Sequence, residues 1–323
     1  MKRSTIVSLI VATSLIALAV IVFIVGMTMA KFNFSAKLFT TASYETSTHE
    51  ITDEFDSITI KALTSDVEIL PSNDGVARVV SFERTNLKHT VEVTDGALTV
   101  NGEDTRRWID HISIVNTESP KISVYLPSEE YGALSIDLTT GDIRVEEFSF
   151  ASINIEVTTG DVECLASSAA ELNIHTTTGD VGISGASVGS MSLKTTSGTV
   201  NIFEISCDSD IHVKSTTGDS VLTNVSCKNL SVNCGSGDTK MKNVIASELL
   251  SIDKTTGDVD FAACDAANLK INVTTGDVEG TLLSEKIFAT HTSTGDIDVP
   301  SGTQGGICEI STTTGDIEID ILP

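Results

Sequence analysis

One short phrase recurs ten times along this chain, in the pattern apolar-x-apolar-x-x-Thr-Thr-Gly-Asp-Val with small variations. Its glycines are always 19 or 20 residues apart: Gly141, Gly160, Gly179, Gly198, Gly218, Gly237, Gly257, Gly276, Gly295 and Gly315. A fixed period of this length is typical of stacked units, because a single unit cannot bury its apolar face alone. The repeat therefore predicts a solenoid.

The spacing of apolar residues predicts the cross-section of each coil. Counted from the repeat glycine as position 0, positions −7 and −5 are apolar, as in Leu172 and Ile174, and so are +2 and +4, as in Val181 and Ile183. Side chains alternate along a strand, so inward positions keep one parity within it. The parity changes at the glycine and again between +4 and +7, which predicts a corner at each place. We expect an all-β fold, a parallel β-solenoid (β-helix) of about ten 19–20-residue coils.

The Thr-Thr-Gly-Asp phrase itself is expected to form the first corner. A four-residue turn of this composition places glycine third, where type II geometry requires a positive φ. The flanking Thr and Asp side chains can bond local backbone groups. All ten repeat glycines are therefore predicted to be structural turn residues.

The N-terminus carries a second strong signal. Residues 5–30 contain no charged side chain and exceed the ~20 apolar residues that span a bilayer. Lys2 and Arg3 precede this segment, which favours a cytoplasmic tip (1–4), one transmembrane helix (5–30) and an exported remainder. The predicted location is the cell membrane, single-pass, with the solenoid extracytoplasmic. A signal peptide cleaved near Met27–Ala30 is the alternative.

The segment before the repeats has its own organisation. Residues 31–50 are polar and are expected to form a stalk. Residues 51–130 are expected to form a first coil, with Ser65 in place of glycine, followed by a β-hairpin capping region around Asp95-Gly96, where type I′ geometry is predicted. Alternating strands are expected at 112–115 and 121–126, and Trp108 as a core or capping residue. Residues 131–323 form the solenoid repeats.

Charge excludes one class of partner. The net charge is −25 and no arginine follows Arg144, so a nucleic-acid backbone would be repelled. Such a balance suits a soluble, self-repelling surface, a cationic partner, or metal ions. The predicted partners are the membrane, through the N-terminal helix, and an envelope protein or glycan.

The lead-in strand Ile122–Pro127, followed by Leu134–Ile143 and its many echoes, resembles a bacterial family of putative adhesins, a domain family of unknown function. The resemblance covers about residues 50 to 323. It implies a β-solenoid with Ser/Thr-Gly-Asp turns and a role in the cell envelope, in surface attachment or in envelope-stress signalling. It implies no catalytic residues.

A column of aspartates at position +1 is the sharpest candidate site. Stacked carboxylates about 5 Å apart repel by roughly 1 kcal/mol per pair in water, so the column needs relief. Hydrogen bonds to turn N–H groups are favoured, and a Ca²⁺ ladder is the alternative; no other cofactor is expected. The residues are Asp142, Asp161, Asp180, Asp219, Asp238, Asp258, Asp277, Asp296 and Asp316, with Thr199 in the remaining coil.

The cysteines and the threonine pairs are two further features of the repeat. All six cysteines fall at inward positions and are expected to be buried thiols, although Cys207 and Cys227, at +9 of successive coils, could form a disulfide. Thr-x-Thr pairs at −3 and −1, which would suit an ice-binding ladder, occur in only some coils.

The predicted function is non-enzymatic: a membrane-anchored extracytoplasmic solenoid acting as an adhesin or as a scaffold and binding module of the envelope. One alternative is an envelope-stress sensor that acts through a partner protein. The other is a Ca²⁺-dependent polysaccharide-active enzyme, which the scattered lysines and the outward histidines His175, His212 and His291 do not favour.

Overall fold

The structure is a computed structural model that describes residues 43–85, 87–102, 119–127 and 130–322. The predicted transmembrane segment 5–30, Trp108 and the strand expected at 112–115 lie outside these residues. Within them, no helix has the length and apolar character needed to cross a membrane.

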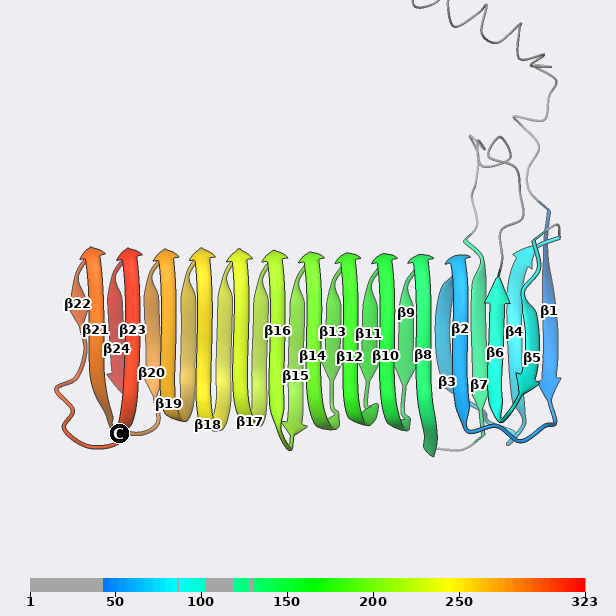
Figure 1. Ribbon diagram of the computed structural model, residues 1–323, viewed down its shortest axis with the longest axis horizontal. Coiled ribbons are helices and arrows are strands. Elements are labelled where there is room, and N and C mark those ends of the chain that lie inside the picture. The colour runs from blue at the N-terminus through cyan, green and yellow to red at the C-terminus, as the bar shows by residue number, and fades with distance from the viewer. Residues whose placement is uncertain (1–42, 86, 103–118, 128–129, 323) are drawn as a thin grey trace, which may run out of the picture. The chain divides into compact units, whose positions relative to one another are not determined.

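Each turn of the solenoid consists of two strands and two corners. The turn around Gly160 runs through the long strand β10 (Ser149–Thr159), the glycine corner, the short strand β11 (Val162–Leu165) and a second corner at Ala166. It then enters the next long strand, β12 (Ser168–Thr178), which pairs in parallel with β10. Figure 1 shows this unit repeated along the molecule. The prediction of an all-β parallel solenoid is confirmed, and the ten glycine corners bound nine complete turns.

The stacked strands form two parallel faces. The long face contains β2 (Ser57–Thr64), β8 (Glu130–Thr140), β10, β12, β14 (Ser187–Ser197) and β16 (Asp210–Thr217). The short face contains β3 (Asp66–Pro71), β9 (Ile143–Glu146), β11, β13 (Val181–Ser184) and β15 (Val200–Cys207). Three later strands run continuously around the second corner and join both faces: β17 (Ser220–Ser236), β18 (Thr239–Thr256) and β19 (Val259–Thr275).

The interior is largely apolar and is filled by the side chains at the predicted positions. In the turn around Gly179, the side chains at −7, −5, +2 and +4 are at most 2% exposed: Leu172, Ile174, Val181 and Ile183. Ala186 and Val188, at +7 and +9, complete the ring at 4% and 1%. Because most coils repeat this ring, the buried residues form one continuous apolar cluster along the axis, whereas Ile297 in the outermost coil is 44% exposed.

The glycine corner differs from the type II turn that the sequence predicts. The repeat glycines have φ between 115° and 150°, whereas a type II turn needs about 80° at this position. The stacking of the coils adds a second requirement for glycine. A Cβ on Gly160 would lie 1.9 Å from the carbonyl oxygen of Gly141 in the preceding coil. Glycine is therefore required both by its own backbone conformation and by the coil beneath it.

The second corner was predicted between +4 and +7, and it lies at +6. The residue there adopts a left-handed conformation in seven successive coils: Glu147, Ala166, Gly185, Glu204, Asn224, Asn243 and Ala263, with φ between 48° and 64°. Only one of these is glycine, because a Cβ at this corner has room. On Gly185 it would come no closer than 3.8 Å to the coil below.

A cap covers the N-terminal end of the stack. The first coil, β2 and β3, carries on its outer side β6 (Ala97–Gly102) and β7 (Lys121–Leu126), in parallel register. Three antiparallel strands complete the cap: β1 (Tyr44–Ile51), β4 (Ala77–Arg84) and β5 (Thr90–Thr94). The β5–β6 turn has φ of 51° at Asp95 and 77° at Gly96, which confirms the type I′ hairpin. Residues 44–50, expected in the stalk, belong instead to β1.

The C-terminal end departs from a simple stack. The remaining strands are β20 (Val278–Leu282), β21 (Lys286–Thr294), β22 (Ile297–Asp298), β23 (Gly306–Thr314) and β24 (Ile317–Ile321). The last coil in sequence, β23–β24, pairs with β19–β20 on one side and with β21–β22 on the other. The coil of Gly295 is therefore outermost, and the coil of Gly315 is inserted beneath it (Figure 1).

Candidate functional site

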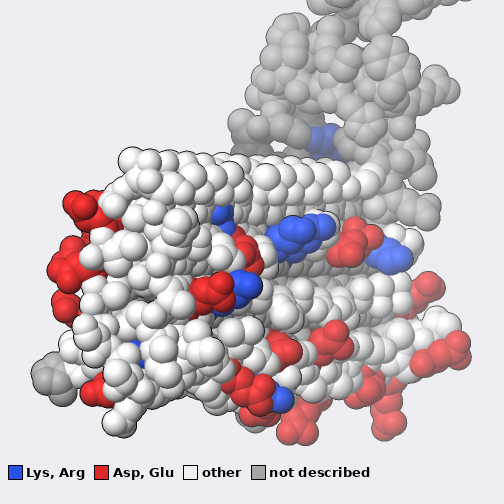
Figure 2. Space-filling model, turned by 60° about the vertical axis from the view of Figure 1, so that its left-hand side comes forward, with Lys and Arg blue, Asp and Glu red and all other residues white. Residues whose placement is uncertain are grey.

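The most regular surface of the molecule is the edge where the long strands end. The side chains at −2 and −1 are exposed hydroxyls in almost every coil, and we call this surface the hydroxyl rim. It comprises Thr139, Thr140, Thr158, Thr159, Thr177, Thr178, Thr196, Ser197, Thr216, Thr217, Ser236, Thr255, Thr256, Thr274, Thr275, Ser293, Thr294, Thr313 and Thr314. Figure 2 shows the upper edge, where the long strands end, as an uncharged surface of evenly spaced atoms.

The two rows of the hydroxyl rim arise from the corner geometry. Position −2 points outward by the alternation of the strand, while −1 is turned outward because the chain bends into the glycine corner. Position −3 points inward: Thr176 and Thr195 are 0% and 2% exposed. The Thr-x-Thr pairs considered in the sequence therefore do not share a surface. The rim is built from adjacent threonines, in parallel register from coil to coil.

The aspartate column at +1 lies just past the repeat glycine, at the same corner, and forms a hydrogen-bonded ladder. The backbone N–H of Asp161 donates to Oδ1 of Asp142 at 2.9 Å, and that of Asp180 donates to Oδ1 of Asp161 at 2.7 Å. The same bond recurs for the other pairs, beginning at Asp66 in the first coil. Thr199 donates to Asp180 at 2.7 Å but offers no carboxylate to the next coil. In each of these carboxylates, one oxygen thus accepts a hydrogen bond from a backbone N–H of the adjacent coil.

In this geometry, repulsion between the stacked carboxylates is relieved by hydrogen bonds from backbone N–H groups. The carboxylates do not form a preformed cage around a cation. Among the described residues, no three His, Cys, Asp or Glu side chains come together as a metal-binding group. Calcium takes six to eight oxygen ligands. The ladder leaves one outward oxygen per coil, so a Ca²⁺ ion would have to complete its shell largely with water.

The inside of the glycine corner holds a few buried polar groups. Lys254, at −3, is 5% exposed, and its Nζ donates to the carbonyl oxygen of Asp258 at 2.9 Å and to Oγ1 of Thr239 at 3.2 Å. Burial lowers the pKa of this amine, against the attraction of nearby groups that include Cys234 and Asp238. Thr312 also bonds a backbone carbonyl at this corner: its Oγ1 donates to the carbonyl oxygen of Gly276. These contacts satisfy backbone carbonyls at the corner and open no path to solvent.

The six cysteines are buried free thiols in this structure. Burial raises the pKa of Cys164, Cys227 and Cys308 to about 12. Cys207 and Cys227 are 6% and 7% exposed and lie in adjacent coils, next to the paired residues Ser206 and Ser226. The proposed disulfide between them would join two neighbouring rungs.

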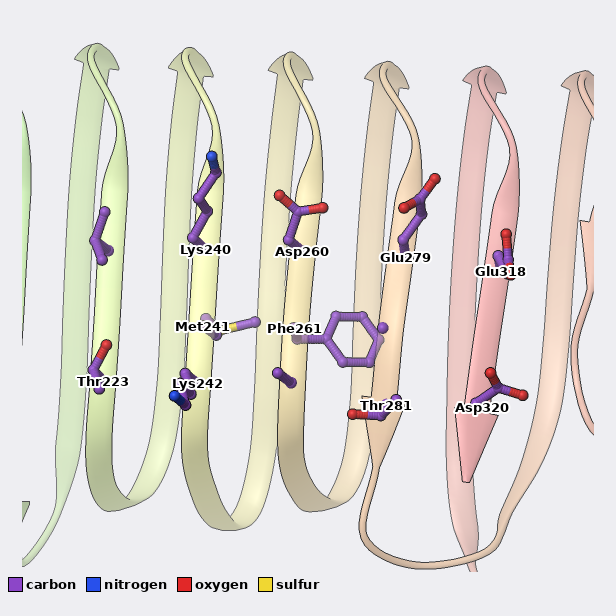
Figure 3. Close-up of a pocket in the computed structure, with 13 residues that line it drawn as sticks. Thr223, Lys240, Met241, Lys242, Asp260, Phe261, Glu279, Thr281, Glu318 and Asp320 are labelled. Carbon is purple, nitrogen blue, oxygen red and sulfur yellow. The ribbon is translucent and has the colours of Figure 1, made fainter. Parts of the chain in front are cut away.

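A shallow groove of about 400 Å³ lies on the short face (Figure 3). Lys240, Asp260, Glu279 and Glu318 form one row across four adjacent strands, with Asp260 opposite Glu279 and Glu279 opposite Glu318. Burial, together with Glu318 and Asp260, raises the pKa of Glu279. Among the described residues that line the groove, Phe261 is the one aromatic side chain, and it is 3% exposed.

One polar cluster could not be found from the sequence. Glu83 and His89 lie in the cap, where Nδ1 of His89 contacts Glu83, and Nε2 of His89 contacts Ser65 at the first corner. All three side chains are largely buried. The three residues follow no recognisable motif or spacing, and only the docking of the cap onto the first coil brings them together.

A family model described as Toastrack DUF4097 matches residues 55–224 and 208–322. No sequence among the curated proteins is significantly similar to this chain.

The solved structures to which this chain is similar include a putative adhesin from Bacteroides fragilis, at 15% identity and a TM-score of 0.42, which covers 87% of this chain and 100% of its own. A putative adhesin from Parabacteroides distasonis has 11% identity and a TM-score of 0.38, covering 86% and 97%. A putative lipid binding protein from the same organism has 13% identity and a TM-score of 0.35, covering 87% and 99%.

Proposed function

The chain belongs to the Toastrack DUF4097 family, and on this premise we propose that it is a non-enzymatic binding module of the cell envelope that acts through its hydroxyl rim. The observation that carries the proposal is the regularity of this surface. Hydroxyl groups are exposed at −1 in every repeat coil, in register across paired strands about 4.8 Å apart. A repetitive surface of this kind suits a repetitive partner.

We propose an uncharged, hydroxyl-rich envelope polysaccharide as that partner. The rim offers hydroxyls that both donate and accept hydrogen bonds, and it carries no charged side chain. The rest of the molecule has a net charge of −25, which disfavours polyanions. Many weak contacts along one line would combine by multivalency rather than through one deep pocket.

We further propose that residues 5–30 anchor the chain in the membrane, with the solenoid on the extracytoplasmic side. The motivation is the uncharged apolar segment after Lys2 and Arg3. Accessibility of added cysteines to a membrane-impermeant reagent tests this topology. Labelling at residue 323 but not at residue 4 in intact cells is expected, and the reverse pattern would contradict it.

The alternative of a polysaccharide-cleaving enzyme is less well supported. Glu279 and Glu318 are adjacent carboxylates, but the described residues of their groove include no exposed aromatic ring on which a sugar could stack. The other alternative is a sensor that acts through a protein partner. Co-purification of a stoichiometric partner protein from membranes would distinguish this role from that of an adhesin.

The test adds charge to the rim of three consecutive coils. Thr158→Lys, Thr177→Lys and Thr196→Lys in the full-length chain are expected to weaken binding to purified cell-wall polysaccharide by about tenfold or more, equivalent to ~1.4 kcal/mol. The matched control is Asn154→Lys, Asn173→Lys and Ser192→Lys, which adds the same charge to the long face of the same coils. Equal binding by both triple variants would refute the rim as the binding surface.

A further inference from the structure

We infer that Ser65 is an acyl-acceptor serine, activated by His89 and positioned by Glu83, and that it takes small activated acyl esters. This chemistry lies in the N-terminal cap and is independent of binding at the hydroxyl rim. It rests on the arrangement of three side chains that the fold brings together from separate segments.

The three side chains form a continuous relay. Oγ of Ser65 lies 3.3 Å from Nε2 of His89, and Nδ1 of His89 lies 2.8 Å from Oε2 of Glu83. With the carboxylate at Nδ1, that nitrogen carries the hydrogen, so the lone pair of Nε2 faces the serine. This is the order of nucleophile, base and orienting carboxylate that activates serine in acyl transfer.

The Glu83 carboxylate accepts further hydrogen bonds besides its contact with the His89 ring. Oε1 of Glu83 accepts from Oγ of Ser47 at 2.6 Å, and Oε2 also accepts from the backbone N–H of His89 at 2.6 Å. Burial alone would raise the pKa of Glu83, but these hydrogen bonds outweigh it and hold the pKa below its ordinary value. Glu83 therefore stays ionised and fixes both the backbone and the ring of His89.

A glycine fixes the ring from the other side. A Cβ on Gly102, at the end of β6, would lie 2.6 Å from Cδ2 of His89, so the imidazole packs directly on that backbone. Gly102 pairs with Ala62, three residues before Ser65. The imidazole is thus confined between the end of β6 and the first corner, with its base nitrogen toward Ser65.

The reaction is a transfer of an acyl group from an ester to Ser65. At rest the Ser65 hydroxyl donates to the carbonyl of Thr64 at 2.6 Å, and rotation of its hydrogen alone directs it to Nε2. Oγ then bonds to the acyl carbon as Nε2 takes the proton. The bond to the leaving alcohol breaks as that alcohol receives the proton, leaving a Ser65 ester, a free alcohol and neutral His89.

The same geometry slows both acylation and deacylation, so only an activated ester, whose alcohol leaves more readily than a serine alkoxide, is expected to react. The N–H of Ser65 donates to Thr140 and that of Asp66 donates to Pro120, so neither is free to stabilise an oxyanion. Ser65 is 2% exposed and the His89 side chain 7%, which restricts access to small acyl donors. A stable acyl-serine is therefore the expected product.

The experiment treats the full-length chain with p-nitrophenyl acetate and locates the acetyl group by mass spectrometry. We expect one acetyl group on Ser65, with the rate lowered about 10²-fold or more in His89→Ala and in Glu83→Gln. Ser65→Cys, which keeps a nucleophile beside His89, should be alkylated by iodoacetamide faster than Ser65→Cys combined with His89→Ala.

Controls separate activation from folding. Ser167, which is 0% exposed and whose Oγ contacts only backbone groups, supplies the matched variant Ser167→Ala, with unchanged acetylation of Ser65. Melting curves identify variants that unfold. Absence of acetyl-Ser65 in the folded parent chain, or an acetylation rate that a folded His89→Ala variant does not change, would overturn the inference.

Discussion

The carbonyl oxygen of Gly160 lies 2.0 Å from the point that a Cβ atom on Gly179 would occupy. Gly179 also has a φ of 145°, in a region that other residues rarely adopt. The repeat glycine is therefore fixed by contact between coils as well as by its own turn.

Substitutions at the two corners of one coil should differ in cost. Gly179→Ala forces neighbouring backbones apart and is expected to destabilise by more than about 4 kcal/mol, among the largest single-residue effects. Gly185→Ala places a Cβ in ordinary contact at a left-handed residue, at a cost of about 1–2 kcal/mol. Urea unfolding of both variants measures the difference. Similar losses would mean that backbone conformation alone requires glycine at the first corner.

The aspartate ladder should depend on its acceptor oxygen rather than on its charge. Asp180→Ala removes the acceptor for the N–H of Thr199 and is expected to cost about 1–3 kcal/mol. Asp180→Asn keeps an acceptor and relieves repulsion between stacked carboxylates, so little stability should be lost. Melting curves of both variants, with and without millimolar Ca²⁺, make the comparison. A rise in melting temperature with Ca²⁺ that Asp180→Asn abolishes would instead support a cation ladder.

The inserted C-terminal coil should depend on one buried ion pair. Nζ of Lys286, 3% exposed, lies 2.6 Å from Oδ1 of Asp265, reaching from β21 to β19 across Gly306 of the intervening β23. Asp265→Ala leaves the buried Lys286 ammonium without its carboxylate partner. The free energy of unfolding is therefore expected to fall by up to about 3–5 kcal/mol.

Hydrogen exchange should locate this effect in β23 and β24. The matched control is Lys228→Met, which breaks the exposed pair with Glu248 and should cost no more than about 1 kcal/mol. Equal protection of β23 in Asp265→Ala and in the parent would show that the pair does not hold the inserted coil.

Stability should fall at alkaline pH because of buried thiols. The pKa of Cys164, Cys227 and Cys308 is raised from 9.0 to about 12 in the folded chain. Above pH 9 the unfolded chain loses these protons while the folded chain keeps them, so the free energy of unfolding decreases as pH rises from 9 towards 12. Each thiol contributes at most about 1.4 kcal/mol per pH unit.

Urea unfolding at pH 8 and pH 10 measures this slope. The triple variant Cys164→Ala, Cys227→Ala, Cys308→Ala should be less stable than the parent at pH 8. Its free energy of unfolding should nevertheless fall less than that of the parent between pH 8 and pH 10. A slope equal to that of the parent would assign the alkaline effect to other groups.

Cys207 and Cys227 provide a separate redox prediction. Burial raises the pKa of both thiols, and the thiolate is the form that attacks in disulfide formation. We expect both to remain reduced in the folded chain, with no mass difference on adding reductant. A loss of two hydrogens that maps to this pair would establish the disulfide between adjacent coils.

The repeat alone specified the solenoid, its apolar interior and the places of both corners. Period-two alternation is a local property, so Leu172, Ile174, Val181 and Ile183 could be placed inside without knowledge of any distant contact. The hairpin at Asp95-Gly96 was equally local, because its turn chemistry lies within two residues. The hydrogen-bonded aspartate ladder followed from a repeat that places like residues above one another.

The tertiary structure alone decided the features that depend on which coil lies beside which. The 19–20-residue period does not specify that the coil of Gly315 is inserted between the coils of Gly276 and Gly295. Each coil offers the same edge, so the sequence order Gly276, Gly295, Gly315 would satisfy the period equally well. The φ of the repeat glycines is set by the coil beneath. The contact of Ser65 with His89, which Glu83 holds in place, requires the cap to fold back onto the first coil. Such contacts join segments whose sequences carry no mutual signal, so packing alone selects them.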